Sequence, residues 1–341
     1  MSEANNPQVL SLCVVAYNEE EHLPNLLKDF CNQTYPRKFL EIVLIDGKSS
    51  DHTLQIMNDF AKKNYGFYGV QVLNNPKRIQ AAGWNVAFRN FKGDVIARID
   101  AHTRIHKDFA KNVMADIAKG EDVVGGIRPC LCRKKTPWAK VLLQTENSLF
   151  GSSINSVKHS SKKSYVKTCF HPAYRRKVIE TAGLMNEDLL RTEDNEFHYR
   201  VGEKGFRILY DPKIKSYQFM RSSFKSMLKQ KFGNGYWIGY TLGVCPGCIS
   251  PYHLVPFAFL LSIIFTSILA IAGYSIWALL LWICYGLFAV GNTVISAKQN
   301  GFYIQTLLMP VLFLSLHLSY GIGTGWGLIK LLKNEFTSNK N

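Results

Sequence analysis

Residues 94–102 read Asp94-Val95-Ile96-Ala97-Arg98-Ile99-Asp100-Ala101-His102, an apolar run that stops at an acidic residue. The run predicts a buried strand over residues 94–100, which delivers the Asp100 carboxylate to the carboxyl edge of a sheet. Open α/β folds bind their ligands outside that edge. The outer residues of the triplet, Asp100 and His102, can hold a divalent cation there. A second acidic cluster lies far downstream, at Thr192-Glu193-Asp194, and can supply a base.

Three apolar runs precede this strand, at residues 9–16, 40–45 and 69–73, and a helical pattern follows each of them. Short apolar strands that alternate with helices predict an α/β fold with a mostly parallel sheet and helices on both faces. The carboxyl ends of parallel strands share one edge of the sheet, so we expect the four loops after these strands to converge. Farther along, residues 165–170 and 206–210 predict two later strands, the second ended by a turn at Pro212.

Charge divides the chain into two parts. The whole chain has 41 Lys and Arg against 25 Asp and Glu, a formal net charge of +16. From residue 251 onward the only charged residues are Lys298, Lys330, Lys333, Lys340 and Glu335, so +13 of that charge lies before residue 251. We expect a basic domain beside an anionic membrane surface, because such a surface attracts Lys and Arg. Nucleic acid is disfavoured as a partner, since no recognisable binding motif accompanies the charge.

The apolar end of the chain predicts membrane-spanning helices. Residues 254–273, 275–296 and 302–328 are each long enough to cross a hydrocarbon core of about 30 Å, which takes about 20 residues. Pro310 and four glycines between residues 321 and 327 interrupt the third stretch, so the sequence allows two or three crossings. The excess of Lys and Arg predicts a multi-pass protein of the plasma membrane with its basic domain in the cytoplasm.

These patterns divide the sequence into four segments. Residues 1–215 predict the α/β domain, and residues 216–250 a basic, aromatic helix at the membrane interface, with an ordinary surface helix as the alternative. Residues 251–333 predict the membrane region, and residues 334–341 a polar tail. The eight cysteines do not suggest a disulfide framework, and the sequence has neither a dinucleotide-binding nor a P-loop glycine motif.

The loops after the first three strands offer candidate ligands for a nucleotide. The run Val15-Ala16-Tyr17-Asn18-Glu19 lies where a helix begins, and Glu19 can accept a hydrogen bond from a base or ribose. Asp46 ends the second strand and could accept the imide N–H of uracil. Arg78 lies in a basic turn that suits a diphosphate and leads to Asn85. Each group also has a purely structural alternative. The first loop could simply cap its helix, Asp46 could belong to an ordinary turn, and Arg78 could be a solvated surface charge.

The two acidic clusters complete this set. A metal on Asp100 that bridges two phosphates would neutralise the charge that builds on a leaving nucleotide. An imidazole ligand from His102 would favour Mn²⁺ over Mg²⁺; otherwise His102 hydrogen-bonds a phosphate or packs in its loop. Asp194 is the candidate base, crowded by the charges of Glu193 and Glu196, and a helix cap is the alternative. Metal, diphosphate and base together suit the displacement of a nucleotide from a sugar.

Residues 9–205 resemble the family 2 glycosyltransferases. The motifs that carry the resemblance are Val15-Ala16-Tyr17-Asn18-Glu19, Asp46-Gly47-Lys48-Ser49-Ser50-Asp51-His52-Thr53, Gln80-Ala81-Ala82-Gly83-Trp84-Asn85, Asp100-Ala101-His102 and Thr192-Glu193-Asp194. The resemblance implies a GT-A fold and an inverting transferase that takes a nucleotide-sugar donor, expected to be UDP-linked, with Mn²⁺ or Mg²⁺.

The resemblance also implies roles for single residues. Asp194 would be the base, Glu193 would meet the acceptor, and Asp100 with His102 would hold the metal. The residues expected to line the nucleotide-sugar pocket are Val15, Tyr17, Glu19, Asp46, Arg78, Asn85 and Asp100. Lys229 and Lys231, in the basic helix, would hold the diphosphate of the acceptor.

Two departures refine the resemblance. The Asp-Ala-His triplet followed by a membrane hairpin is most similar to the branch that contains the succinoglycan-type exopolysaccharide glucosyltransferase. Processive synthases carry Q-x-x-R-W, whereas Gln230-Lys231-Phe232-Gly233-Asn234 lacks the Arg-Trp pair, which favours the addition of a single sugar. The membrane region implies a lipid-linked glycan acceptor. The alternatives are transfer to polyprenyl phosphate or a glycerolipid, and a non-catalytic membrane assembly protein. The sequence carries no code for the donor sugar or the oligomeric state.

Overall fold

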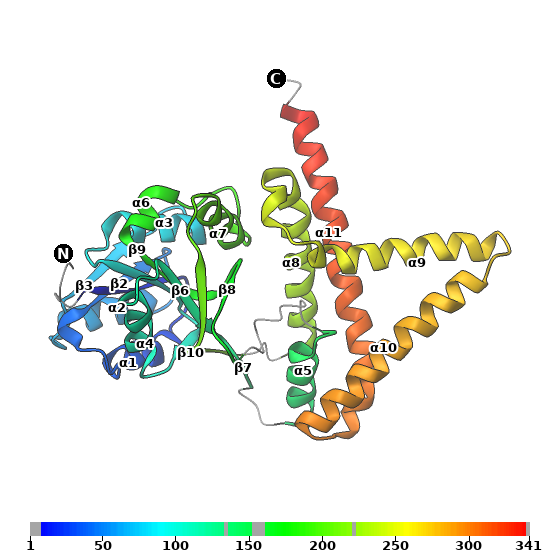
Figure 1. The fold of residues 1–341 in the computed structure, drawn as a ribbon, viewed down its shortest axis with the longest axis horizontal. Coiled ribbons are helices and arrows are strands. Elements are labelled where there is room, and N and C mark those ends of the chain that lie inside the picture. The colour runs from blue at the N-terminus through cyan, green and yellow to red at the C-terminus, as the bar shows by residue number, and fades with distance from the viewer. Residues whose placement is uncertain (1–7, 133–135, 152–160, 220–222, 339–341) are drawn as a thin grey trace. The chain divides into compact units, whose positions relative to one another are not determined.

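The computed structural model describes residues 8–132, 136–151, 161–219 and 223–338, with side chains up to residue 333 (Figure 1). The chain forms two compact units. The first contains residues 1–129 and 156–219, and the second contains residues 130–155 and 220–341.

The first unit is an α/β domain built on one mixed sheet (Figure 1). Its strands are β1 Leu10–Ala16, β2 Leu40–Asp46, β3 Gly69–Asn74, β4 Val95–Asp100, β5 Thr103–Ile105, β6 Val123–Ile127, β8 Ser164–Val166, β9 Phe170–Arg175 and β10 Ile208–Phe219. The order along the sheet is β3-β2-β1-β4-β9-β6-β10-β5. The four N-terminal strands are parallel to one another, as predicted, and β9 lies antiparallel between β4 and β6.

Helices cover both faces of this sheet because its strands are apolar on both sides. Leu12 and Val14 of β1 pack with one set of helices, while Cys13 points to the other face. The first set is α1 Leu23–Cys31, α2 Thr53–Lys62 and α4 Phe109–Ile117. The second set is α3 Gln80–Asn90, α6 Arg176–Ala182 and α7 Glu193–Glu203.

The later strands differ from the sequence prediction. Residues 164–175 form two strands, β8 and β9, where one strand over residues 165–170 was predicted. The last strand does not end before Pro212 but continues to Phe219. Its register against β6 shifts between Asp211 and Lys215, and a bulge of this kind accommodates a proline that has no N–H to donate.

Gly126 of β6 offers a direct test of this sheet geometry. A Cβ at Gly126 would overlap the carbonyl group of Ile214 in β10, whereas a Cβ at Gly69 of β3 would meet no atom within 4 Å. We therefore expect Gly126→Ala to destabilise the protein by about 1–3 kcal/mol. Gly69→Ala is the matched control and should change stability by less than about 0.5 kcal/mol. Thermal unfolding of the two purified variants measures both, and equal midpoints would contradict the packing of β6 on β10.

The second unit is helical (Figure 1). Its main helices are α5 Pro137–Asn147, α8 Phe224–Val244, α9 Val255–Ile271, α10 Ile276–Asn300 and α11 Met309–Ser338. Three segments are long and apolar enough to cross a membrane, namely Pro251–Ile271, Ile276–Asn300 and Ile304–Lys333. Within this unit, α9 and α10 form a hairpin that projects from the paired helices α8 and α11.

The glycines of the third apolar stretch pack it against α8 and α9 and do not interrupt it. Gly235 and Gly239 of α8 lie against the carbonyl groups of Tyr320 and Thr324, and two glycines of α11 face the α8 backbone in the same way. The contacts advance together along both helices, so α8 and α11 run parallel with their backbones in contact. Pro310 falls in the first turn of α11, where proline is tolerated.

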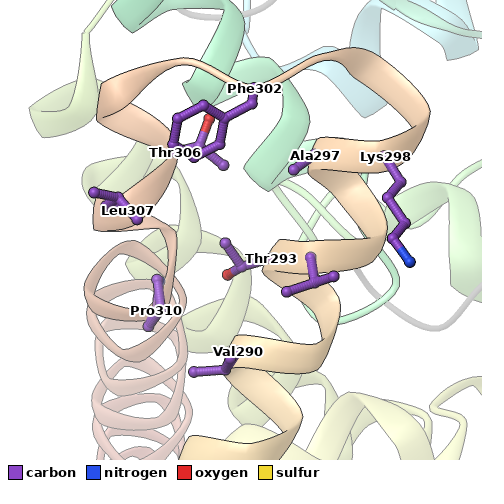
Figure 2. Close-up of a pocket in the computed structure, with 9 residues that line it drawn as sticks. Val290, Thr293, Ala297, Lys298, Phe302, Thr306, Leu307 and Pro310 are labelled. Atoms are coloured by element: carbon purple, nitrogen blue, oxygen red, sulfur yellow. The ribbon is translucent and has the colours of Figure 1, made fainter.

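An apolar cavity of about 450 Å³ opens within the second unit (Figure 2). Its lining residues come from the end of α10, the short helix at Ile304–Leu308 and the start of α11. They are Val290, Thr293, Val294, Ala297, Lys298, Phe302, Thr306, Leu307 and Pro310.

Candidate active site

The carboxyl ends of the N-terminal strands bring the predicted loops to one edge of the sheet. Ala16 pairs with Asp46 across β1 and β2, and Val15 pairs with Asp100 across β1 and β4. Asp46 also pairs with Asn74 at the end of β3. The convergence expected from the strand pattern is therefore confirmed.

The first two loops are held together by hydrogen bonds. The Asn18 backbone N–H donates to Ser49 Oγ at 3.0 Å, and the Glu19 N–H donates to Thr53 Oγ1 at 2.8 Å. Asp46 is buried, and its two carboxylate oxygens lie 3.2 and 3.3 Å from the Ser49 backbone nitrogen. Asp46 thus organises the turn after β2, and its contact with a base stays a prediction.

The other residues predicted for the nucleotide pocket lie in different surroundings. Tyr17 and Arg78 are exposed, and Arg78 has a left-handed backbone with φ of 61°. Val15 packs so closely on α3 that a side chain at Gly83 would overlap it. Asn85 is buried and bonded through its amide to the Met185 backbone and to Glu187 at 2.9 Å. A nucleotide contact by any of these residues stays a prediction.

Asp100 is surrounded by two basic side chains that the sequence analysis did not identify. Its Oδ2 atom accepts a hydrogen bond from Arg128 Nη1 at 2.7 Å and lies 3.3 Å from His171 Nε2. Arg128 follows β6 and stacks 4.0 Å from the centre of the Phe170 ring. Burial would raise the pKa of Asp100, but the hydrogen bond and charge of His171, with Arg128 and His102, hold that pKa well below its usual range.

His102 lies on the solvent side of this cluster. Its Nδ1 atom is 3.5 Å from Glu19 Oε1, so the first and fourth loops meet here. No group of three or more His, Cys, Asp or Glu side chains forms a metal cage within the described residues. Within the same described residues, no group donates a hydrogen bond to Asp100 Oδ1.

Asp194 and Glu193 begin α7 on the face of the sheet that carries Arg98. Arg98 and Asp100 are two residues apart on β4 and therefore point to the same face. Burial raises the pKa of Asp194, and the positive charge of Arg98 opposes that rise. The pKa of Glu193 is raised by burial and then by the charge of Asp194. Arg98 is itself buried, 4.7 Å from the centre of the Trp84 ring.

The remaining acidic and basic candidates are paired elsewhere or exposed. Glu196 forms a bidentate ion pair with Arg200 on α7, and burial, not crowding by Glu196, is the main cause of the raised pKa of Asp194. In the second unit, Lys231 Nζ lies 3.0 Å from Glu146 Oε1, and Lys229 is exposed. Acceptor contacts by Glu193, Lys229 and Lys231 stay predictions.

Comparisons with known proteins identify the family. Residues 11–183 match the model of glycosyl transferase family 2. The chain belongs to this family. Over 76% of its length, the glycosyltransferase is 31% identical to the dolichyl N-acetyl-alpha-D-glucosaminyl phosphate 3-beta-D-2,3-diacetamido-2,3-dideoxy-beta-D-glucuronosyltransferase of Methanococcus voltae, and the match covers 82% of that protein. It is 26% identical to the succinoglycan biosynthesis protein ExoA of Rhizobium meliloti, over 82% of this chain and 85% of that one.

A solved structure supports the fold of the glycosyltransferase. The mannosyltransferase PcManGT from Pyrobaculum calidifontis, in complex with GDP-Man and Mn2+, aligns with 94% of this chain and 88% of its own. The TM-score is 0.63 at 16% sequence identity. The predicted GT-A fold and the predicted resemblance to the succinoglycan branch are therefore confirmed.

Proposed function

We propose that the glycosyltransferase moves a single sugar, with inversion, from a nucleotide sugar to a lipid-linked glycan acceptor at a membrane. The observation that carries this proposal is that two carboxylates near Arg98, Asp100 and Asp194, have pKa values shifted in opposite directions. Asp100 is held ionised, whereas Asp194 has a raised pKa, and both experience the same buried positive charge. Carboxylates whose pKa values are pushed apart in this way are typical of sites that divide binding and proton transfer between them.

Asp194 is the proposed base. It accepts the proton of the acceptor hydroxyl while that oxygen attacks the anomeric carbon from the side opposite the nucleotide. A base needs to be ionised yet basic, and burial together with the Arg98 charge gives Asp194 both properties. Attack on the opposite side inverts the anomeric centre, so an α-linked donor gives a β-linked product.

The residues around Asp100 fit Mn²⁺ or Mg²⁺. Asp100 Oδ2 is bonded to Arg128 and His171, while Oδ1 and the ring of His102 are left to hold the ion. Sites of this kind take one or two protein ligands, and phosphate oxygens of the substrate supply others. The ion, when bound, would neutralise charge on the leaving diphosphate. Arg128 and Arg78 would add fixed positive charge at the same edge.

The pH dependence of activity should report on the raised pKa of the Asp194 and Glu193 carboxyls. Protonation of Asp194 removes the base, so we expect kcat/KM to fall as the pH decreases through its raised pKa. The acid limb should therefore lie above pH 4, the ordinary range of an aspartic acid. Initial rates between pH 4 and 9, at saturating metal, measure it. A kcat/KM that stays constant down to pH 4 would contradict the role of Asp194.

A lipid-linked acceptor is supported by the relatives and by the second unit. The Methanococcus voltae relative is named for a dolichyl-phosphate-linked sugar, and ExoA for succinoglycan biosynthesis. The second unit has three helices long enough to cross a membrane, and the apolar cavity beside α10 fits a hydrocarbon chain (Figure 2). Exposed Lys229 of α8 is the candidate for the acceptor phosphate.

Two membrane crossings, by α9 and α10, suit the packing of α8 on α11. Met227 of α8 packs with Leu316 of α11, and Ser319 Oγ donates to the Leu228 carbonyl at 2.9 Å. If α11 crossed the membrane, α8 would carry its exposed lysines into hydrocarbon, at about 2.5–3.5 kcal/mol for each. We propose instead that α8 and α11 lie at the cytoplasmic interface.

This topology predicts that the C-terminus lies on the cytoplasmic side, together with Lys330 and Lys333. A C-terminal epitope tag should be cleaved by protease in inside-out vesicles and protected in intact spheroplasts. A tag on the N-terminus is the matched control and should show the same pattern. Cleavage of the C-terminal tag in spheroplasts would indicate three crossings.

A donor panel tests the proposed function. The detergent-purified glycosyltransferase is mixed with UDP-, GDP- and dTDP-sugars and bacterial lipid extract, in Mn²⁺, Mg²⁺ or EDTA. We expect turnover of one donor that EDTA abolishes. Turnover that persists in EDTA would contradict the metal site. No turnover, with no metal-dependent nucleotide binding, would favour the non-catalytic assembly protein.

A further inference from the structure

We propose that Tyr174 and His198 are positioning residues, which hold the start of α7 on the face of the sheet that carries Arg98 so that Asp194 can accept a proton. The inference rests on the proposed function, because it takes Asp194 as the base. Tyr174 and His198 lie outside the five motifs that carry the family resemblance. They meet because α7 packs on the face of the sheet to which Tyr174 of β9 points.

The two residues form a continuous hydrogen-bonded chain. Tyr174 of β9 has its hydroxyl 2.8 Å from His198 Nε2, and His198 Nδ1 lies 2.8 Å from Thr168 Oγ1. Tyr174 pairs with Ile96 across β9 and β4, so its side chain lies on the face of the sheet that also carries Arg98. The chain therefore joins β9, the neighbour of the strand that bears Asp100, to the helix that bears Asp194.

The donors and acceptors in this chain have one consistent direction. The positive charge of Arg98 favours the arrangement in which the Tyr174 oxygen faces it, so the Tyr174 O–H donates to His198 Nε2. His198 must then carry its proton on Nδ1 and donate to Thr168. A neutral imidazole is required for this pattern, and burial, followed by the charge of Arg98, lowers the pKa of His198 to about 3. The direction of the chain is thus the same across the ordinary pH range.

The chain is rigid because both residues are fully packed. Tyr174 is 0% exposed and His198 is 2% exposed. The Tyr174 ring lies edge-on to the Phe88 and Phe197 rings, with centroids 6.4 and 5.5 Å away. His198 follows Asp194 by four residues on α7, so both lie on one side of the helix. Hydrogen bonds that hold the His198 side chain in place therefore also hold the first turn of α7, which carries the base.

The charges around Asp194 make the position of Arg98 important. The groups that affect it are Arg98 and Asp100 of β4, Arg128 after β6, and Glu193 beside it on α7. Arg98 is the main group that favours the ionised carboxylate. Two of its donors, Nε and Nη1, have no hydrogen-bond partner within the described residues, so the effect of its charge on Asp194 depends on where the first turn of α7 is held.

Tyr174→Phe tests the inference, because it removes one oxygen and keeps the packed ring. We expect kcat to fall about tenfold, as for loss of the buried hydrogen bond to His198, with little change in the donor KM. The acid limb of kcat/KM should move to higher pH, since a less restrained first turn of α7 leaves Asp194 less well placed against the Arg98 charge. Tyr35→Phe is the matched control: it removes a hydroxyl that donates to the Gln8 backbone carbonyl, away from the site, and should change neither value.

Two variants of His198 separate positioning from simple packing. His198→Gln can still accept from Tyr174 and should keep most of kcat and an unshifted acid limb. His198→Leu cannot accept that hydrogen bond and should behave like Tyr174→Phe. Thermal midpoints of both are measured alongside. If all variants lose activity only in proportion to stability, with no shift of the acid limb, the residues are structural and the inference is overturned.

This outcome is distinguishable from failure of the proposed function. If Asp194→Asn keeps the wild-type rate, the assignment of the base is wrong and the inference fails with it. If Asp194→Asn loses activity while Tyr174→Phe retains the wild-type rate and pH profile, only the inference fails.

Discussion

Asp194→Asn should lower the rate of sugar transfer by about 10²- to 10⁴-fold, the usual contribution of a positioned general base. The change is isosteric, and the Asn side chain can still accept the hydrogen bond that Asp194 Oδ1 accepts from the Asn195 N–H at 2.8 Å. We therefore expect the variant to fold and to bind the nucleotide sugar with wild-type affinity. Single-turnover rates and donor binding, measured on the same sample, separate the two effects.

Asp188→Asn is the matched control for this variant. Asp188 is exposed in the segment before α7, and its replacement removes the same charge without touching Arg98. Its rate should remain within about twofold of wild type, as expected for a surface substitution. A wild-type rate for Asp194→Asn would exclude Asp194 as the base, and loss of nucleotide binding would assign it to the donor site instead.

Asp100→Asn should be the most damaging substitution in the first unit, because it affects both activity and stability. The Arg128 side chain is 16% exposed and would lose its carboxylate partner. The pair is partly buried, so losing one member should cost about 1–3 kcal/mol of stability, less than in a fully buried pair. The site would also lose its proposed metal ligand, and the ion held there would supply several kcal/mol of transition-state stabilisation, so activity should fall at least about 100-fold.

His102→Ala separates these two effects. The His102 side chain is 43% exposed, and its ionic contact among the described residues, with Glu19 at 3.5 Å, is a long one. We expect this variant to require more Mn²⁺ for half-maximal activity while its thermal midpoint stays close to wild type. If the Mn²⁺ requirement is unchanged, His102 is not a ligand. EDTA-sensitive activity at the wild-type level in Asp100→Asn would exclude Asp100 as a metal ligand.

The edge of the sheet could be predicted from the sequence because each of its loops directly follows an apolar strand. The run that ends at Asp100 and the run that ends at Asp46 needed no long-range information. The basic partners of Asp100 could not be predicted, because Arg128 and His171 come from strands whose order in the sheet depends on tertiary packing. Gly125 and Gly126, just before Arg128, were a signal that backbones approach closely there.

The membrane region, too, could be predicted from the sequence only in part. Length and apolarity predicted three candidate spans, and all three are helices. The four glycines near the end of the third span were interpreted as breaks. Instead, Gly323 and Gly327 are four residues apart, which places both on the side of α11 that contacts α8. The interpretation failed because a glycine that breaks an isolated helix also permits close helix packing, and only the partner helix decides between them.

The most direct test of the account is transfer of a radiolabelled sugar into lipid. The donor identified by the panel is incubated with the glycosyltransferase, Mn²⁺ and membrane lipid, and the label is partitioned between water and organic solvent. The account predicts that label enters the organic phase with the wild-type protein, that EDTA prevents this, and that Asp194→Asn does not support it. Label that is released from the nucleotide but remains in water would show that the enzyme does not use a lipid-linked acceptor.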